Sequence, residues 1–204
     1  VRREIVRTHT PGTVSDTELL EGDDHCFLAA IGGDGLQSTI AWIEVSTGRF
    51  EGMDCGDGHT LSEQLARLRP REVLVSEDND TWSEAWPPEL PTPTATPLSP
   101  DEFSPAAGEQ RLRRVLGVAS LRGFGLNSGE RLVGMAGAWV GYVESTHRGA
   151  LQHLRSFARR QPDDALVIDR ASLRNLEVEH ASDGTRRGSL LATLDHTKTR
   201  MGAR

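Results

Sequence analysis

The sequence is poor in cysteine, lysine and aromatic residues, and it has no long apolar run. Cys26 and Cys55 are its only cysteines, which argues against the disulfide-rich scaffold of a small secreted protein. No apolar run approaches the roughly 18 residues of a membrane-spanning helix, and no secretory leader is recognisable. With 36% hydrophobic residues, the chain can form a hydrophobic core. We therefore expect a soluble, cytoplasmic protein.

Charge is distributed unevenly along the chain, whose formal net charge is −7. Residues 1–105 contain 20 acidic and 7 basic residues, whereas residues 106–204 contain 10 acidic and 16 basic ones. Lys198 is the only lysine, so almost every cation is an arginine, which keeps its charge in every environment. The acidic total argues against a general nucleic-acid-coating protein. The basic second half suits an acidic partner.

Short apolar runs separated by turn residues predict a β-meander in the first half. Residues 25–31 and 38–46 flank a Gly-Asp-Gly turn, the pattern of a hairpin. Residues 49–54 follow a second turn and predict a third strand. Residues 1–24, which precede the first predicted strand, are mostly polar and contain a Thr10-Pro11-Gly12-Thr13 turn. They predict a segment that leads into this domain.

The apolar spacing then becomes helical. Thr60 and Glu63 form a capping box at the start of a helix, and Pro70 ends it. Residues 72–76 predict a fourth strand. Three strands, a helix and a strand indicate an α/β fold with a mixed sheet and flanking helices. Ribonuclease H-like domains begin with this order, so we expect that fold class.

The middle of the chain predicts a proline-rich connection and two helices. Residues 87–100 hold six of the ten prolines, which predicts a surface loop or a short edge strand, with an inter-domain linker as the alternative. Ser104-Pro105 begins a helix that Gly117 ends. The longest predicted helix covers about 127–160. It carries glycines at small spacings that permit close helix packing: Gly134, Gly137 and Gly141.

The last part of the chain predicts short helices that are too few for a core of their own. They lie around 169–178, capped by Asp169, and 188–194. We expect this tail, beyond the boundary candidate Pro162, to be the start of a second, helical domain. Because the chain starts at Val1 without a methionine and stops within a predicted helix, we also expect it to be a piece of a longer protein.

Motifs for phosphate or metal binding are incomplete. Gly58-His59-Thr60 resembles the end of a P-loop, but it lacks the lysine and the earlier glycine, so we predict only a turn and a helix cap. A zinc site would need Cys26 and Cys55 to meet near His25 and His59, and the sequence has no metal-ligand spacing. His147 and His153 do not share a helix face well. We predict no metal, cofactor-binding or catalytic residue.

A metal-dependent nuclease is the alternative function on a ribonuclease H-like fold. Such nucleases hold two metal ions with carboxylates on the first and neighbouring strands. Residues 26–31 contain no acid, and the nearest candidates are Glu44, Asp54 and Asp78. Cleavage of nucleic acid with Mg²⁺ or Mn²⁺ that depends on Glu44 and Asp54 would favour this alternative.

Several motifs in series resemble the MutS family of DNA mismatch-repair proteins. They occur in family order over nearly the whole chain: residues 3–7, 10–13, 28–31, 46–50, 123–125, 168–169, 174–177, 188–191 and 194–202. Their combination is specific, although each one alone is a weak signal.

The resemblance implies a domain organisation. Residues 1–14 would be the linker from the mismatch-binding domain, 15–160 a ribonuclease H-like connector domain, and 161–204 the beginning of the core or lever domain. The family's ATPase, with its ATP and Mg²⁺, and its mismatch-reading residues would lie outside this chain. We therefore expect a non-enzymatic piece without a cofactor.

The resemblance also implies partners. The family docks MutL on a connector helix, at positions that align with Gln110 and Arg111 in this sequence. Other MutS domains would be partners in the same chain. Mismatched DNA would be contacted through the full-length protein, which would be a homo-oligomer.

Overall fold

The computed structural model divides into two compact units, residues 1–162 and 163–204, and each is described by itself. The structure describes residues 10–12, 26–33, 37–44, 47–79, 82–146, 151, 154–161, 168 and 170–198. His25, His147, His153 and Asp169, which entered the sequence predictions, lie outside these residues. No helix in the described ranges is both long and apolar enough to cross a membrane.

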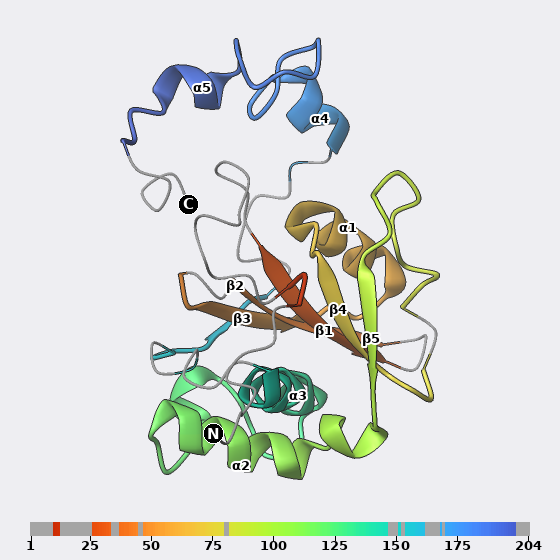
Figure 1. Cartoon of the computed structure of the whole chain (residues 1–204), viewed down its shortest axis with the longest axis vertical. Helices are drawn as coiled ribbons and strands as arrows, with labels where there is room; N and C mark the ends of the chain where they lie inside the picture. Colours follow the sequence, from red (N-terminus) through yellow and green to blue (C-terminus); the bar gives the residue numbers. More distant parts are fainter. Residues whose placement is uncertain are drawn as a thin grey trace, which may run out of the picture. The chain divides into compact units, whose positions relative to one another are not determined.

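A six-stranded mixed sheet forms the centre of the first unit, with the strand order β5-β4-β1-β2-β3-β6 (Figure 1). β1, β2 and β3 are antiparallel neighbours, whereas β4 is parallel to β1, β5 to β4, and β6 to β3. This arrangement confirms the predicted mixed α/β sheet. The strands are β1 (Phe27–Gly33), β2 (Ser38–Glu44), β3 (Arg49–Asp54), β4 (Glu72–Ser76), β5 (Thr94–Leu98) and β6 (Ala158–Arg159).

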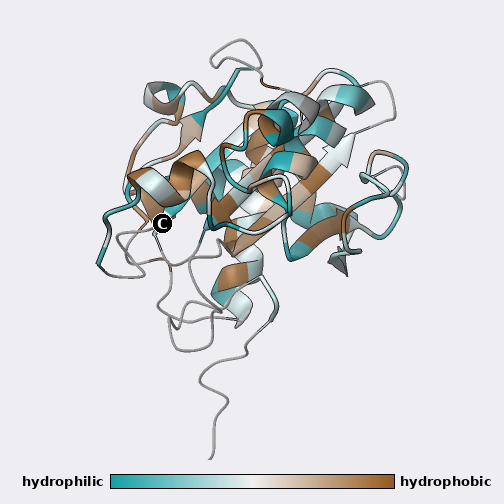
Figure 2. Ribbon diagram, turned by 90° about the horizontal axis from the view of Figure 1, so that it is seen from above, coloured by the Kyte–Doolittle hydropathy of each residue, from teal (hydrophilic) through white to brown (hydrophobic). Residues whose placement is uncertain are grey.

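Helices cover both faces of the sheet (Figure 1). On one face, α1 (Gly58–Leu68) packs through Leu61, Leu65 and Leu68 on one set of alternating strand residues. On the other face lie α2 (Pro105–Leu116) and α3 (Arg131–Thr146). Two short 3₁₀ helices, η1 (Pro100–Phe103) and η2 (Arg122–Phe124), precede α2 and α3. Hydrophobic and hydrophilic stretches alternate along the helices and strands in Figure 2, as expected for elements that bury one side.

Glycines bring α2 and α3 into backbone contact. A Cβ built on Gly137 would lie 2.1 Å from Gly108 Cα, and one on Gly134 would lie 2.1 Å from the Phe103 carbonyl oxygen. Gly108 is equally close to α3, because its Cβ would meet the Val133 carbonyl oxygen at 2.3 Å. The predicted close packing of this helix through its glycines is therefore confirmed.

Two sequence predictions about helix ends were wrong. The predicted helix over 127–160 ends at Thr146, and residues 158–159 form β6 beside β3. Tertiary pairing decides this segment: Arg160 N–H donates to the Gly52 carbonyl at 2.8 Å, and Phe157 is buried in the core. The capping box at Thr60 is replaced by Asp57, whose carboxylate accepts the Thr60 N–H at 2.9 Å. A carboxylate at this position also interacts favourably with the helix dipole.

The proline-rich segment contains an edge strand, which was one of the possibilities predicted for residues 87–100. β5 pairs only with β4, so the missing N–H of Pro97 is tolerated at the edge.

The second unit contains two short helices, α4 (Arg170–Asn175) and α5 (Leu190–Leu194). Backbone hydrogen bonds join α5 to the residues that follow α4, because the Leu190 and Leu191 N–H groups donate to the carbonyls of Glu177 and Val178 at 2.9 Å each. Ser189 caps α5 by accepting the Ala192 N–H at 3.1 Å.

Candidate functional site

Gln110 and Arg111 lie on α2, but they face different surroundings. Gln110 is exposed. The Arg111 guanidinium turns toward its own domain: Nη2 lies 2.6 Å from Glu102 Oε2, and Nη1 donates to the Glu102 carbonyl at 3.1 Å. A Cβ on Gly141 would lie 2.9 Å from this guanidinium. Arg111 therefore helps to fix α2 on η1 and α3, and Gln110 is the member of the pair that solvent reaches freely.

The exposed side of α2 carries further cations at helical spacing. Arg113 and Arg114 follow Gln110 by three and four residues and are exposed, so the three side chains share one face. Arg114 forms an ion pair with Glu144 of α3, with Nη2 and Oε2 2.5 Å apart. No ion pair within the described residues involves Arg113. We call Gln110, Arg113 and Arg114 the α2 face; it combines a neutral amide with positive charge.

The carboxylates proposed for the alternative nuclease do not lie together. Glu44 pairs with Arg49 at one end of the β2–β3 ladder, and Asp54 pairs with Thr39 at the other. The two ends are five residue steps apart along the strand, about 17 Å at the usual rise. Asp78 is exposed and follows the C-terminal end of β4, which lies on the same side of the sheet as the C-terminal end of β3 with Asp54. Within the described residues, no three His, Cys, Asp or Glu side chains are grouped so as to hold a metal ion.

The two cysteines also lie at opposite ends of the strands, so they do not meet in the zinc site that was considered, but not predicted, from the sequence. Cys26 precedes β1 and Cys55 follows β3, which puts them at opposite ends of the antiparallel ladder. Both are buried free thiols. Burial raises the pKa of the Cys55 thiol to about 12, and the nearby Asp54 and Asp57 add to the shift.

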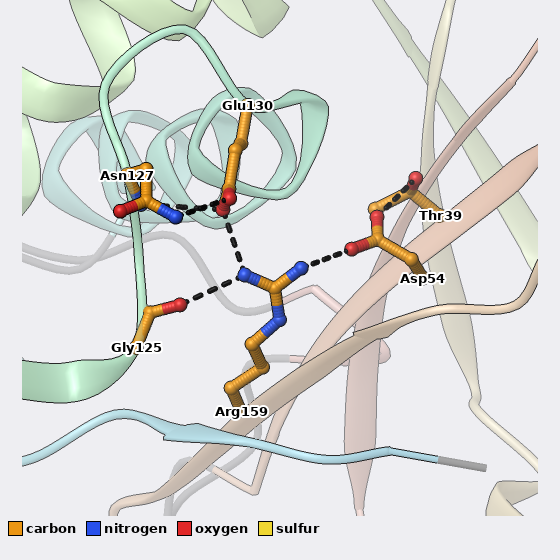
Figure 3. A network of polar contacts seen from close by, with 6 residues as sticks. All are labelled: Thr39, Asp54, Gly125, Asn127, Glu130 and Arg159. Atoms are coloured by element: carbon orange, nitrogen blue, oxygen red, sulfur yellow. Dashed lines mark hydrogen bonds and ion pairs between the residues drawn. The ribbon is translucent and has the colours of Figure 1, made fainter. Parts of the chain in front are cut away.

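Asp54 belongs to a network around Arg159 of β6 (Figure 3). Arg159 Nη2 lies 2.6 Å from Asp54 Oδ2, and Nη1 lies 2.8 Å from Glu130 Oε2 and donates to the Gly125 carbonyl at 2.8 Å. Thr39 Oγ1 donates to the other Asp54 oxygen at 3.0 Å, and the Asn127 side-chain amide donates to Glu130 at 2.7 Å. One guanidinium thus joins β3, the turn before α3 and the N-terminus of α3.

A cavity of about 850 Å³ opens at this edge of the sheet. Its lining includes two carboxylates, Asp54 and Glu130, and two guanidinium groups, Arg131 and Arg159. All four groups have hydrogen-bond or ion-pair partners within the protein. Arg131 Nη1 donates to the Gln37 carbonyl at 2.7 Å, and the other three groups form the Arg159 network. The lining is therefore an internally balanced polar surface.

Because of these ion pairs, the free energy of unfolding depends on pH. Burial by itself raises the pKa of Glu130, but hydrogen bonds from Asn127 and the Arg159 guanidinium outweigh it and hold that pKa below its ordinary value. A depressed carboxyl pKa stabilises the fold above the unfolded value of about 4.3. This stabilisation is lost as the pH falls through the lower folded value.

We expect the free energy of unfolding to decline below about pH 4, and to decline less steeply in an Arg159→Met variant, which lacks the cation. Chemical denaturation between pH 3 and pH 7 measures this. Arg67→Met, at an exposed position of α1, is the matched control and should keep the wild-type slope. Equal acid slopes for the Arg159 variant and the wild type would contradict the assignment.

A family comparison identifies the part of the chain that contains these features. Residues 26–155 match the family model of MutS domain II. The chain belongs to the MutS family. It is 43% identical to the DNA mismatch repair protein MutS of Dinoroseobacter shibae and 36% identical to that of Syntrophobacter fumaroxidans, covering 100% of this chain and 23% of each relative. A MutS protein of Cereibacter sphaeroides is 41% identical over the same shares. The chain thus spans about a quarter of the length of these curated relatives.

MutS domain II is the connector domain of a DNA mismatch-repair protein, so the predicted family membership is confirmed. The matched segment includes β1 to β5 and α1 to α3, and with them the α2 face. β6, with Arg159, lies just beyond the matched segment but completes its sheet.

Sequence reasoning missed a buried acid within the MutS segment. Glu72 was assigned only to the beginning of a strand, yet it is 1% exposed. An acid directly before the apolar residues 73–75 was the available signal, because such strands are buried in parallel sheets and a buried carboxylate needs hydrogen-bond partners. Those partners come from distant parts of the chain, which the sequence does not bring together.

Proposed function

We propose that this chain is the non-catalytic connector module of a MutS mismatch-repair protein. In this role it links the mismatch-binding part to the core and ATPase parts of the same protein, and it docks MutL on α2. Its fold is the ribonuclease H-like fold of the connector. Residues 1–14 are the incoming linker, 15–160 the connector, and 161–204 the beginning of the core or lever domain.

The match to MutS domain II over residues 26–155 is the observation that carries the proposal. The separation of Glu44 from Asp54 supports a mechanical role over the nuclease alternative. In this account ATP, Mg²⁺ and mismatched DNA are contacted by other parts of a cytoplasmic, homo-oligomeric protein, and this piece has no cofactor of its own.

Gln110 on the α2 face, with Arg111 beside it on the same helix, supports docking of MutL at this pair. The exposed amide of Gln110 offers both a donor and an acceptor, and the adjacent cations favour an acidic partner surface. Arg111 contributes by fixing α2 in place as well as by its charge, since its guanidinium is paired with Glu102.

Charge reversal on α2 tests this proposal. We expect Arg111→Glu in the full-length protein to reduce crosslinking to MutL in the clamp state by about tenfold, equivalent to ~1.4 kcal/mol of binding free energy. Gln110→Ala should also reduce it, with little effect on stability, because this side chain is exposed.

Two controls separate docking from packing. Glu102→Gln removes the negative charge beside Arg111 but keeps the backbone carbonyl that accepts from it and leaves every charge on α2 unchanged. Arg67→Glu makes the same charge change on the helix that covers the opposite face. Both should crosslink like the wild type. Unchanged crosslinking of the Arg111 and Gln110 variants would remove these residues from the contact surface.

A further inference from the structure

The buried carboxylate of Glu72 binds three separate parts of the first unit through neutral donors. Its Oε1 accepts the Tyr142 hydroxyl of α3 at 2.6 Å and the Thr96 hydroxyl of β5 at 2.8 Å. Its Oε2 accepts the Gly12 backbone N–H at 2.8 Å. Hydrogen bonds to an ionised acceptor are roughly twice as strong as neutral ones. One side chain thus joins β4 to β5, to α3 and to residues 10–12.

Residues 10–12 fit closely against the sheet at this point. Gly12 is buried, and a Cβ built on it would lie 2.8 Å from Glu72 Cβ and 3.0 Å from Leu28 Cδ1. The Pro11 carbonyl accepts the Cys26 thiol at 3.1 Å. The Thr10 side chain is hydrogen-bonded to Tyr142. Each of the three residues therefore makes its own contact with the domain.

We propose that Glu72 is a latch that holds residues 10–12 on the sheet and ties them to α3 through Tyr142. Removal of the acceptor releases this segment while the sheet stays folded. Displacement of the segment in turn changes the surroundings of the Tyr142 hydroxyl. The latch is a property of this chain alone. Its use, to pass movement of the preceding residues to α3 and the adjoining α2, rests on the proposed function.

Amide hydrogen exchange of the 204-residue chain tests the first half of the proposal. Glu72→Met keeps the length of the side chain but removes the acceptor, and Glu72→Gln keeps an acceptor, because the hydroxyls of Tyr142 and Thr96 can turn to accept from its NH₂ group. We expect Gly12 exchange to accelerate by about tenfold or more in the Met variant, as for the loss of one charge-assisted hydrogen bond. Exchange should accelerate less in the Gln variant than in the Met variant, because Gln keeps an acceptor but loses the charge.

Two further amides and one further variant control for general destabilisation. Ala30 and Leu74 lie in the paired centre of the sheet and should keep their exchange rates. Thr96→Val removes a donor from Oε1 but leaves the Gly12 bond, so Gly12 should remain protected. Equal Gly12 exchange in the wild type and the Met variant would overturn the latch. If exchange in the sheet also accelerates in the Met variant, the latch is tested with the Gly12→Ala variant instead, through the pKa of Tyr142.

The Gly12→Ala variant tests the second half, because its added Cβ displaces residues 10–12 from the sheet without removing the Glu72 carboxylate. Tyr142 is the only tyrosine of the chain, so phenol absorbance after rapid pH jumps reports on α3. Burial, followed by Glu72, raises the pKa of this phenol. We expect the pKa to fall toward its ordinary value in Gly12→Ala, as water reaches the site. An unchanged pKa would contradict the coupling. Neither readout involves MutL, so failure of the latch and failure of the docking proposal are distinguishable.

Discussion

Replacement of Gly137 by valine should lower the free energy of unfolding by about 3 kcal/mol, at the upper end of the usual cost of overpacking. The reason is that Gly137 faces backbone, with Gly108 Cα only 2.1 Å from the position of an added Cβ. A backbone atom cannot change rotamer to make room, so α2 and α3 must separate and expose Leu112 of α2, which is fully buried in the core cluster that the two helices share.

Urea denaturation measures this effect, and Gly58→Ala is its matched control. Gly58 is also helical, but no atom lies within 4 Å of its added Cβ. The control should leave stability unchanged or raise it by up to about 1 kcal/mol, because alanine favours the helix. A Gly137→Val protein as stable as the wild type would show that the two helices do not pack backbone to backbone.

Truncation of Trp139 to alanine should cost about 4 kcal/mol, within the range for large aromatic side chains in cores. Trp139 is 1% exposed on α3 and contacts Phe50 of β3, with ring centroids 4.9 Å apart. It fills the layer between the sheet and α3, the helix on which α2 rests. Its loss therefore leaves a cavity beneath the docking helix as well as reducing buried apolar area.

Trp139→Phe separates packing from polarity. The indole Nε1 has no hydrogen-bond partner among the described residues, so phenylalanine loses volume but no hydrogen bond there. We expect about 1–2 kcal/mol for this change, measured in the same urea series. A cost for phenylalanine close to that for alanine would contradict the packing account, because it would assign the stabilisation to the indole itself and not to the volume that it fills.

Local signals in the sequence predicted much of the sheet. The turn residues between the apolar runs predicted the separation of β1, β2 and β3, and helical leucine spacing predicted α1. Gly117 correctly ends α2, where it adopts φ of 68°. These features depend on residues close together in the chain, so periodicity and turn chemistry are enough to find them.

Features that depend on distant partners were not predictable. β6 forms because β3 offers unpaired backbone groups to residues 158–159, and nothing in that short segment signals a strand. Arg111 turns inward because Glu102 and α3 surround it, although helix spacing alone leaves its direction open. Glu72 is paired with groups 24 to 70 residues away, so its burial is a property of the assembled sheet.

A photo-crosslinker attached at position 110 of the full-length protein tests docking on α2 most directly. It is introduced as Gln110→Cys, and the native cysteines of this chain do not interfere because both are buried. The account predicts an ATP-dependent crosslink to MutL from position 110 and none from the same probe at Arg67→Cys, on the opposite face of the sheet. Equal crosslinking from both positions, or a crosslink from position 67 alone, would contradict it.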